Sequence, residues 1–140
     1  MFAIDVSTEL ADFFAEKMAS APQGSPNADP GNIELVITER PPVPLDDGLI
    51  DQMLAINLMH ELDGHWEALP EMRRLVRDGG RLVVLDWLAI ERPAGPPIDH
   101  CLDPMRAQAL LDNAGFTLID EPAGAKERFP YHYTYLMEAT

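Results

Sequence analysis

Acidic, amide and imidazole side chains recur directly after the apolar runs of this sequence. They are Asp5, Glu39, Asn57, His60 and Asp86. A carboxylate at a strand end can accept two hydroxyl groups in charge-assisted hydrogen bonds, and an imidazole can move protons near neutral pH. Because open α/β sheets bind ligands at the carboxyl ends of their strands, we expect these side chains to line one edge of a sheet.

Ordinary structural roles compete with these functional interpretations. Asp5 could help Ser7 start a helix, Glu39 could be an exposed loop acid, and a single histidine such as His60 is more often a packed or capping residue than a catalyst. In the segment HELDGH the second histidine, His65, comes one residue too late for the HExxH zinc motif. No Ser-His-Asp set or carboxylate pair indicates hydrolysis. We therefore predict no metal site and assign no catalytic residue.

Hydrophobic patterning predicts strands that alternate with helices. The expected strands are residues 2–6, 33–37, 50–57, 81–86, 117–121 and 131–138. The expected helices are residues 7–19, with Ser7 as the N-cap, 66–76, which ends at Asp78-Gly79-Gly80, and 104–113, which begins at Pro104. The strand at 50–57 is nearly continuous apolar sequence, which is typical of a parallel strand covered by helices on both faces.

This element order predicts the fold class. Short connections between alternating strands and helices favour an open, mostly parallel α/β sheet in a single domain over residues 1–140. The last two strands follow each other without a helix, so the C-terminal strand should be antiparallel. Residues 21–31 contain three prolines and two glycines and predict a mobile loop.

Composition excludes several classes of function. A formal net charge of −14 opposes binding to nucleic acid, which depends largely on Lys and Arg. No apolar run approaches the ~18 residues of a membrane-spanning helix, and the N-terminus lacks the basic start of a signal peptide, so we expect a cytoplasmic protein without a membrane segment. The single cysteine, Cys101, can form neither an internal disulfide nor a thiolate zinc cluster.

The chain resembles a known enzyme family over nearly its whole length. The ordered set Asp5, Glu39, Asn57, Gly79-Gly80, Asp86 and Ala114-Gly115-Phe116 is similar to class I S-adenosylmethionine-dependent methyltransferases, in the branch of quinone-biosynthesis and arsenite-type enzymes. The resemblance implies a Rossmann-like sheet, S-adenosylmethionine as cofactor and a small molecule as methyl acceptor. Arsenite methyltransferases proper use several cysteines, so the lone Cys101 argues against that activity.

The resemblance also implies roles for particular residues. Asp5 would bind the ribose of the cofactor, and Glu39 with the backbone N–H of Arg40 would meet the adenine edge, where the family usually carries Asp. Asn57 and Leu58 would lie near the methionine part.

On the acceptor side, the resemblance places three further residues. His60 would lie near the entrance to the acceptor site. Asp86 and Trp87 would end the next strand at the same edge, under a covering loop that begins at Arg92.

One family element has no counterpart in the sequence. The glycine-rich turn that grips the cofactor would precede Phe2, and the strand before it is central in the family order three, two, one, four, five, seven, six. Without that strand, the strands at 2–6 and 50–57 would lie roughly 9.6 Å apart with unpaired backbone. The two strands could pair directly, another chain could supply a strand, or the N-terminal segment could leave its family position.

The last two arrangements favour a homo-oligomer formed through the open sheet edge. Two functions therefore stay open. One is a truncated methyltransferase-like protein whose cofactor binding is weakened. The other is a non-catalytic interaction or dimerisation protein derived from a methyltransferase.

Overall fold

The computed structural model describes residues 1–20, 33–122 and 124–140. The chain divides into two compact units, Met1–Pro44 and Leu45–Thr140, and each unit has its own sheet. We describe each unit by itself. The loop expected at residues 21–31 lies outside the described residues.

The first unit is built on two parallel strands. β1 (Phe2–Asp5) pairs with β2 (Glu34–Ile37), and α1 (Thr8–Ala19) follows β1. The Asp5 side chain turns the chain from strand into helix, because its Oδ1 accepts a hydrogen bond from the Ser7 N–H at 2.8 Å. Beyond β2, the N–H of Thr38 donates to the Asp5 carbonyl at 3.0 Å. The two strands therefore end at one edge.

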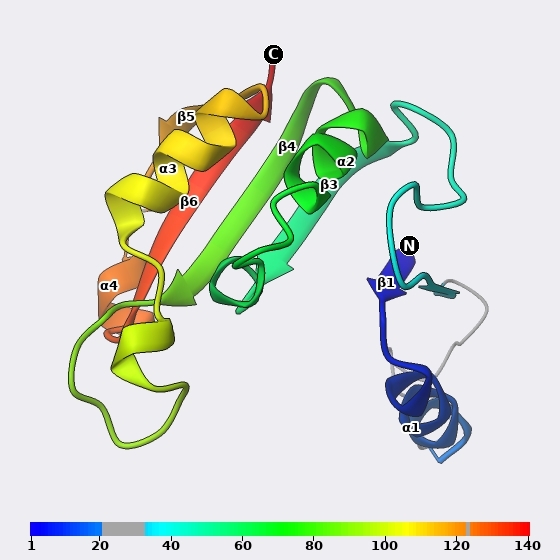
Figure 1. Cartoon of the computed structure of the whole chain (residues 1–140), viewed down its shortest axis with the longest axis horizontal. Helices are drawn as coiled ribbons and strands as arrows, with labels where there is room; N and C mark the ends of the chain where they lie inside the picture. The colour runs from blue at the N-terminus through cyan, green and yellow to red at the C-terminus, as the bar shows by residue number, and fades with distance from the viewer. Residues whose placement is uncertain (21–32, 123) are drawn as a thin grey trace. The chain divides into compact units, whose positions relative to one another are not determined.

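The second unit is built on a four-stranded sheet in the order β3-β4-β6-β5 (Figure 1). Its strands are β3 (Ile50–Ile56), β4 (Val76–Trp87), β5 (Phe116–Asp120) and β6 (His132–Ala139). β3 and β4 are parallel, whereas β6 runs antiparallel to both of its neighbours. The predicted antiparallel C-terminal strand is confirmed. A one-turn helix, α4 (Ala125–Arg128), lies between β5 and β6, where no helix was expected.

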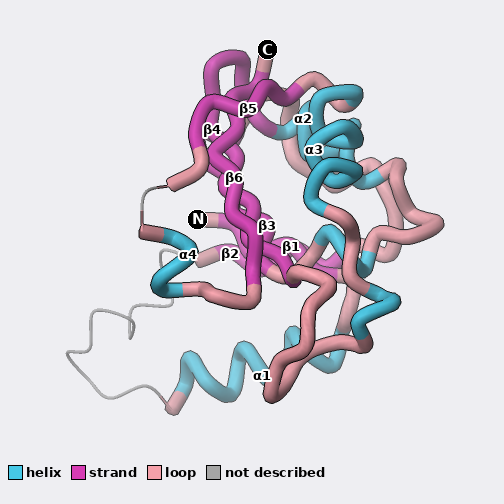
Figure 2. Tube along the Cα trace, turned by 90° about the vertical axis from the view of Figure 1, so that its left-hand side faces the viewer, coloured by secondary structure: helices cyan, strands magenta, loops and turns pink. Residues whose placement is uncertain are grey.

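Two helices cover one face of this sheet. α2 (Ala68–Leu75) and α3 (Pro104–Asn113) lie on the same side of the strands in both views (Figures 1 and 2). α3 begins where the sequence predicts, with Pro104 in its first turn and Asp103 as the N-cap. The Asp103 carboxylate accepts a hydrogen bond from the Arg106 N–H at 3.0 Å, which satisfies one of the free donors of the first turn.

The boundaries of α2 differ from the expected 66–76. The N–H groups of Ala68 and Leu69 bond to carbonyls three residues back, so the segment before them is a tight turn. Val76 is extended and already belongs to β4. The glycines that were expected to end the helix instead lie in an irregular stretch of β4. There a Cβ on Gly80 would come within 2.6 Å of Val76 Cγ1.

The hydrophobic core of the second unit lies between its sheet and these two helices. Its largest fully buried side chains include Phe116, Leu82, Leu111 and Met137, which come from β5, β4, α3 and β6. They alternate along their strands with residues that face away from the helices. Burial of this apolar area is the main stabilising contribution to the second unit.

The prediction that β3 is covered on both faces is wrong. Ala55 is buried, but its neighbours Leu54 and Ile56 are 64% and 57% exposed. Within the described residues β3 pairs with β4 alone and lies in a different sheet from β1.

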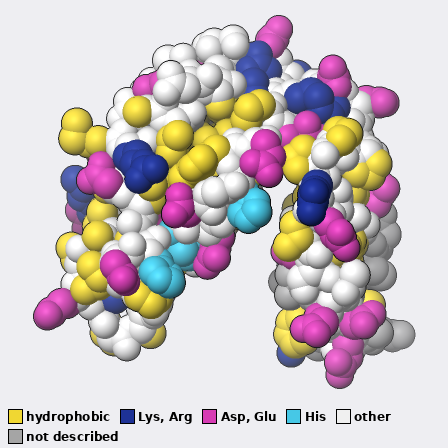
Figure 3. Space-filling model, in the orientation of Figure 1, with side chains coloured by type: hydrophobic (Ala, Val, Ile, Leu, Met, Phe, Trp, Pro, Cys, Tyr) yellow, Lys and Arg dark blue, Asp and Glu magenta, His cyan; other side chains and the backbone are white. Residues whose placement is uncertain are grey.

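The surface carries many more acidic than basic side chains. Asp and Glu are spread over the face shown in Figure 3, in line with the formal net charge of −14. Among the helices of the described segments, none is long and apolar enough to cross a membrane.

Candidate functional site

A buried carboxylate lies at the carboxyl edge of the second unit's sheet. Asp86, near the end of β4, is fully buried. Its Oδ2 accepts a hydrogen bond from the Met59 N–H at 2.6 Å, and its Oδ1 accepts one from the Trp87 N–H at 2.7 Å. The first of these bonds caps the short 3₁₀ turn η2 (Met59–Glu61) that follows β3. Asp86 thus joins two parallel strands where both of them end.

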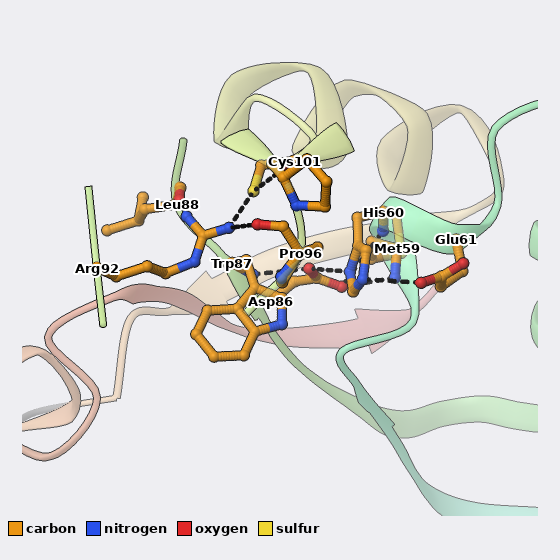
Figure 4. A network of polar contacts seen from close by, with 10 residues as sticks. Met59, His60, Glu61, Asp86, Trp87, Leu88, Arg92, Pro96 and Cys101 are labelled. Atoms are coloured by element: carbon orange, nitrogen blue, oxygen red, sulfur yellow. Dashed lines mark hydrogen bonds and ion pairs between the residues drawn. The ribbon is translucent and has the colours of Figure 1, made fainter. Parts of the chain in front are cut away.

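The same carboxylate holds His60. Nδ1 of His60 lies 2.7 Å from Asp86 Oδ1, and the side chain is only 6% exposed (Figure 4). Because both Asp86 oxygens accept backbone N–H groups, the Asp86 carboxyl group is suited to accept a further hydrogen bond from Nδ1–H of His60. In that tautomer a neutral ring has its lone pair on Nε2. It lies 3.1 Å from Oε1 of Glu61, whose side chain is 71% exposed.

Asn57 and Leu58 link β3 to this pair of side chains. The Asn57 N–H donates to the Leu85 carbonyl at 2.8 Å, which keeps Asn57 at the sheet edge. Its φ of 54° is in the left-handed region, and no other non-glycine residue in the described part of the chain has a positive φ. Such backbone strain is typical of functional sites. The predicted residues Asn57, Leu58, His60 and Asp86 are therefore together in one short stretch of edge.

Trp87 supports the loop that follows β4. Its ring lies 3.9 Å from the ring of His132 and 5.1 Å from the Arg92 guanidinium. Arg92 also donates to the Leu88 carbonyl at 2.9 Å, to Cys101 Sγ at 3.1 Å and to the carbonyl of Pro96 (Figure 4). Arg92 therefore fixes the covering loop. Burial lowers the pKa of His132, and the nearby Arg92 charge lowers it further, although Asp86 opposes the shift.

The remaining predicted cofactor residues belong to the first unit. Asp5 is partly buried at the end of β1, whereas Glu39 and Arg40 are exposed just beyond β2. The Thr38 hydroxyl donates to the Arg40 carbonyl at 2.8 Å and shapes this turn. Asp5 and Glu39 thus follow neighbouring strands within their own unit, and Asn57 and Leu58 belong to the second unit.

Sequence reasoning found the site residues of the second unit singly and missed their connections. The Asp86–His60 contact joins residues 26 positions apart, and no spacing rule indicates it. From the sequence, Arg92 was named only as the first residue of the covering loop. Sequence reasoning assigned no role to His132 or Tyr133 beyond membership of the strand expected at 131–138. Their alternation along β6 was the one available signal that they face opposite sides of the sheet.

Comparison with known proteins identifies the family. A family model described as "Methyltransferase domain" matches residues 1–84. The 27-O-demethylrifamycin SV methyltransferase of Amycolatopsis mediterranei is 32% identical over 57 residues, which make up 41% of this chain and 21% of that protein. The chain therefore matches about a fifth of the length of this curated relative.

Solved structures agree on the fold. A SAM-dependent methyltransferase from Aquifex aeolicus has a TM-score of 0.80 at 24% identity, covering 99% of this chain and 68% of that one. The [4+2]-cyclase SpnF has a TM-score of 0.67 at 15% identity, covering 98% and 64%. S-adenosylmethionine is the cofactor of the matching domain family. The chain belongs to the class I S-adenosylmethionine-dependent methyltransferases.

Proposed function

We propose that this chain is part of a cytoplasmic methyltransferase that methylates a hydroxyl group of a small organic molecule. The Asp86–His60 pair at the carboxyl edge of the sheet carries the proposal, because transfer to a hydroxyl needs a group that removes a proton. The name of the Amycolatopsis relative also indicates methylation of an oxygen atom.

His60 would act as the general base. Asp86 keeps the proton on Nδ1, so Nε2 can accept the acceptor's hydroxyl proton as a bond forms from the acceptor oxygen to the transferred methyl carbon. The exposed carboxylate of Glu61 lies 3.1 Å from Nε2 and can pass that proton to water. When bound, S-adenosylmethionine would supply the electrophilic methyl group, with S-adenosylhomocysteine as the leaving group.

The first unit offers groups that fit the nucleoside part of the cofactor. The Asp5 carboxylate is held at the strand edge by the Ser7 N–H and can accept ribose hydroxyls. Glu39 and the backbone N–H of Arg40 follow the neighbouring strand and suit the adenine edge. Asn57 and Leu58 of the second unit are proposed for the methionine part. These assignments rest on chemistry and on position at a strand edge.

We infer that the described residues bind this cofactor weakly. In the resembled family the glycine-rich turn precedes the strand that corresponds to β1, and the turn after β1, Asp5-Val6-Ser7-Thr8, has no glycine that could take its place. Glycine-rich turns of this kind bring backbone N–H groups close to anionic parts of a ligand. Weakened cofactor affinity is consistent with this turn.

Replacement of His60 tests the proposal. With 27-O-demethylrifamycin SV and catechol as acceptors, we expect His60→Gln to lower kcat by about 10²–10⁴-fold, the usual contribution of a general base. The rise of kcat with pH should disappear as well. Calorimetry with S-adenosylhomocysteine should give the same Kd for both proteins.

His65→Gln is the matched control, because His65 is exposed and five residues away. It should leave kcat unchanged. Equal activity of the His60→Gln variant would remove His60 from the reaction. If the unmodified chain neither transfers a methyl group nor binds S-adenosylhomocysteine, the transferase function is refuted.

An interaction function has its own supporting observation. The exposed Leu54 and Ile56 lie on β3, which has a partner strand on one side only within the described residues. The run Met53-Leu54-Ala55-Ile56 carries no charge. Two copies of this run therefore do not repel each other, although the chains as a whole are strongly acidic. We propose as the alternative that two copies pair antiparallel through β3, since a strand edge is self-complementary in that arrangement.

A charge on the exposed face of β3 tests this alternative. Leu54→Lys should shift the mass measured by light scattering from dimer to monomer, because a lysine on an edge strand opposes association. Met105→Lys, which also replaces an exposed apolar residue but lies on α3, should leave the mass unchanged. A monomeric unmodified chain at all concentrations would exclude the dimer.

A further inference from the structure

One arginine side chain organises the segment that follows β4, which comprises the covering loop and the residues that lead into it. Nη1 of Arg92 donates to the carbonyls of Leu88 and Ile90, each at 2.9 Å. Nη2 donates to the carbonyl of Pro96 and to Cys101 Sγ at 3.1 Å (Figure 4). Acceptors from the start, the middle and the end of this segment therefore point at one guanidinium group.

A glycine brings the backbone of the segment against the same guanidinium. Gly95 has a φ of 132°, in a region that favours glycine. A Cβ at this position would come within 2.6 Å of Arg92 Nε and within 3.3 Å of Trp87 Cη2. A residue with a side chain would therefore push the segment away from both Arg92 and Trp87.

This arrangement has an energetic cost. Nε of Arg92 is buried and has no hydrogen-bond partner among the described residues. Buried N–H groups without a partner are rare and destabilising. Unfavourable local geometry of this kind persists where the surrounding structure enforces it, and it is concentrated at active sites and ligand clamps.

Arg92 also connects the segment to the residues that hold His60. Its guanidinium lies 5.1 Å from the Trp87 ring. The Trp87 N–H donates to Asp86 Oδ1 at 2.7 Å, and the same oxygen lies 2.7 Å from Nδ1 of His60. The segment is therefore linked to the proposed base through Trp87 and Asp86.

We propose that Arg92 is a positioning residue for the methyl acceptor. It keeps the covering loop folded at the carboxyl edge before any ligand binds, so the acceptor meets a preformed wall and loses little affinity to ordering of the protein. The assignment rests on the proposed methyl transfer, in which the acceptor lies beside His60. Without Arg92 the base still has Asp86, which the Met59 N–H holds at 2.6 Å. Acceptor affinity should therefore fall while the chemical step continues.

Amide hydrogen exchange of the full chain without ligands tests the preformed loop. The N–H groups of Ile90, His100 and Cys101 donate within the segment. In Arg92→Gln and Gly95→Ala we expect them to exchange at least roughly tenfold faster, while the amides of β4 and β6 keep their rates. Unchanged rates of the three amides in both variants would show that the segment does not depend on Arg92, which would overturn the proposal.

Steady-state kinetics with 27-O-demethylrifamycin SV and catechol tests the effect on the acceptor. Arg92→Gln and Gly95→Ala should each raise the KM for the acceptor about tenfold and keep kcat within about threefold. A general loss of structure would not produce this split. Arg92→Lys keeps the positive charge but lacks the planar fork of donors, so it should behave like Arg92→Gln.

Arg106→Gln is the matched control. Arg106 also lies over a tryptophan ring, that of Trp66 at 5.9 Å, but it belongs to α3. Its replacement should change neither the KM nor the exchange rates of the segment. Unchanged KM in both Arg92→Gln and Gly95→Ala, a fall in kcat that exceeds the rise in KM, or unmodified behaviour of Arg92→Lys would overturn the proposal.

Calorimetry separates this proposal from the transferase function. Titration with catechol in the presence of S-adenosylhomocysteine measures acceptor affinity without methyl transfer. Binding of catechol that Arg92→Gln weakens about tenfold, with no transfer by the unmodified chain, would refute the transferase function and leave the role of Arg92 intact. Transfer with a KM that the substitutions do not change would do the opposite. Absence of both catechol binding and transfer would refute both.

Discussion

Individual residues at the carboxyl edge of the second unit take their roles from neighbours distant in sequence. The sequence predicts that His60 and Asp86 follow different strands. Only the parallel pairing of β3 with β4 brings them to a 2.7 Å contact. The competing interpretation of His60 as a packed residue describes its burial well. Its contacts with two carboxylates are what make it a candidate base.

Two tyrosines of β6 should respond differently to loss of the hydroxyl. Tyr133→Phe removes a buried hydroxyl without a partner among the described residues, so we expect the free energy of unfolding to stay equal or to rise by up to about 1 kcal/mol. Tyr135→Phe leaves the Pro104 carbonyl without its donor and should lower the free energy of unfolding by about 1 kcal/mol. Urea unfolding of the two variants measures the difference. If Tyr133→Phe lowers the free energy of unfolding more than Tyr135→Phe does, the Tyr133 hydroxyl has a partner, which would contradict its assignment as unpaired among the described residues.

At the scale of elements, local signals predicted the start of α3 and the order of the strands. Pro104 indicated the start of α3, and the alternating residues before the C-terminus indicated β6, which the structure places at His132–Ala139. These features depend on neighbouring residues alone. The end of α2 was placed one residue late, since Val76 fits the apolar spacing of the helix as well as it fits the following strand.

Burial of β3 could not be read from its sequence. A continuous apolar run is typical of a strand that is covered on both faces, and Ile50–Ile56 fits this pattern. What lies on each face depends on elements remote in the chain. In the second unit α2 and α3 cover one face only, so Leu54 and Ile56 are exposed.

The two ends of α3 allow a paired test. Asp103→Ala removes the N-cap hydrogen bond to Arg106 and should lower the free energy of unfolding by about 1 kcal/mol. Asp112→Ala removes an acidic side chain from the last turn, where it opposes the helix dipole, and should be neutral or slightly stabilising. Thermal unfolding followed by circular dichroism checks both. Equal effects of the two substitutions would argue against the cap.

At the scale of the whole molecule, the hydrophobic core belongs to the second unit. Every member of the main buried cluster lies after Pro44. Arg74 of α2 holds the start of this unit through hydrogen bonds to the Leu45 carbonyl at 2.8 Å and to Asp47. Hydrogen bonds to Glu71 and Asp47 raise the pKa of Arg74, so this guanidinium stays charged.

We therefore expect residues 45–140 to fold without residues 1–44. A protein consisting of residues 45–140 should show one cooperative urea transition, since its core and its four-stranded sheet are complete within that range. Leu54→Lys can be added to limit association through the exposed face of β3. A broad transition without a cooperative midpoint would show that the second unit requires the first.

The stacking of Trp87 on His132 gives the molecule an optical reporter. The chain has two tryptophans, and within the described segments it is Trp87 that has an imidazole ring against it, at 3.9 Å. A protonated imidazole quenches indole emission more strongly than a neutral one does. Because burial lowers the pKa of His132, the fluorescence of Trp87 should stay bright into mildly acidic solution and dim only below the ordinary range of histidine.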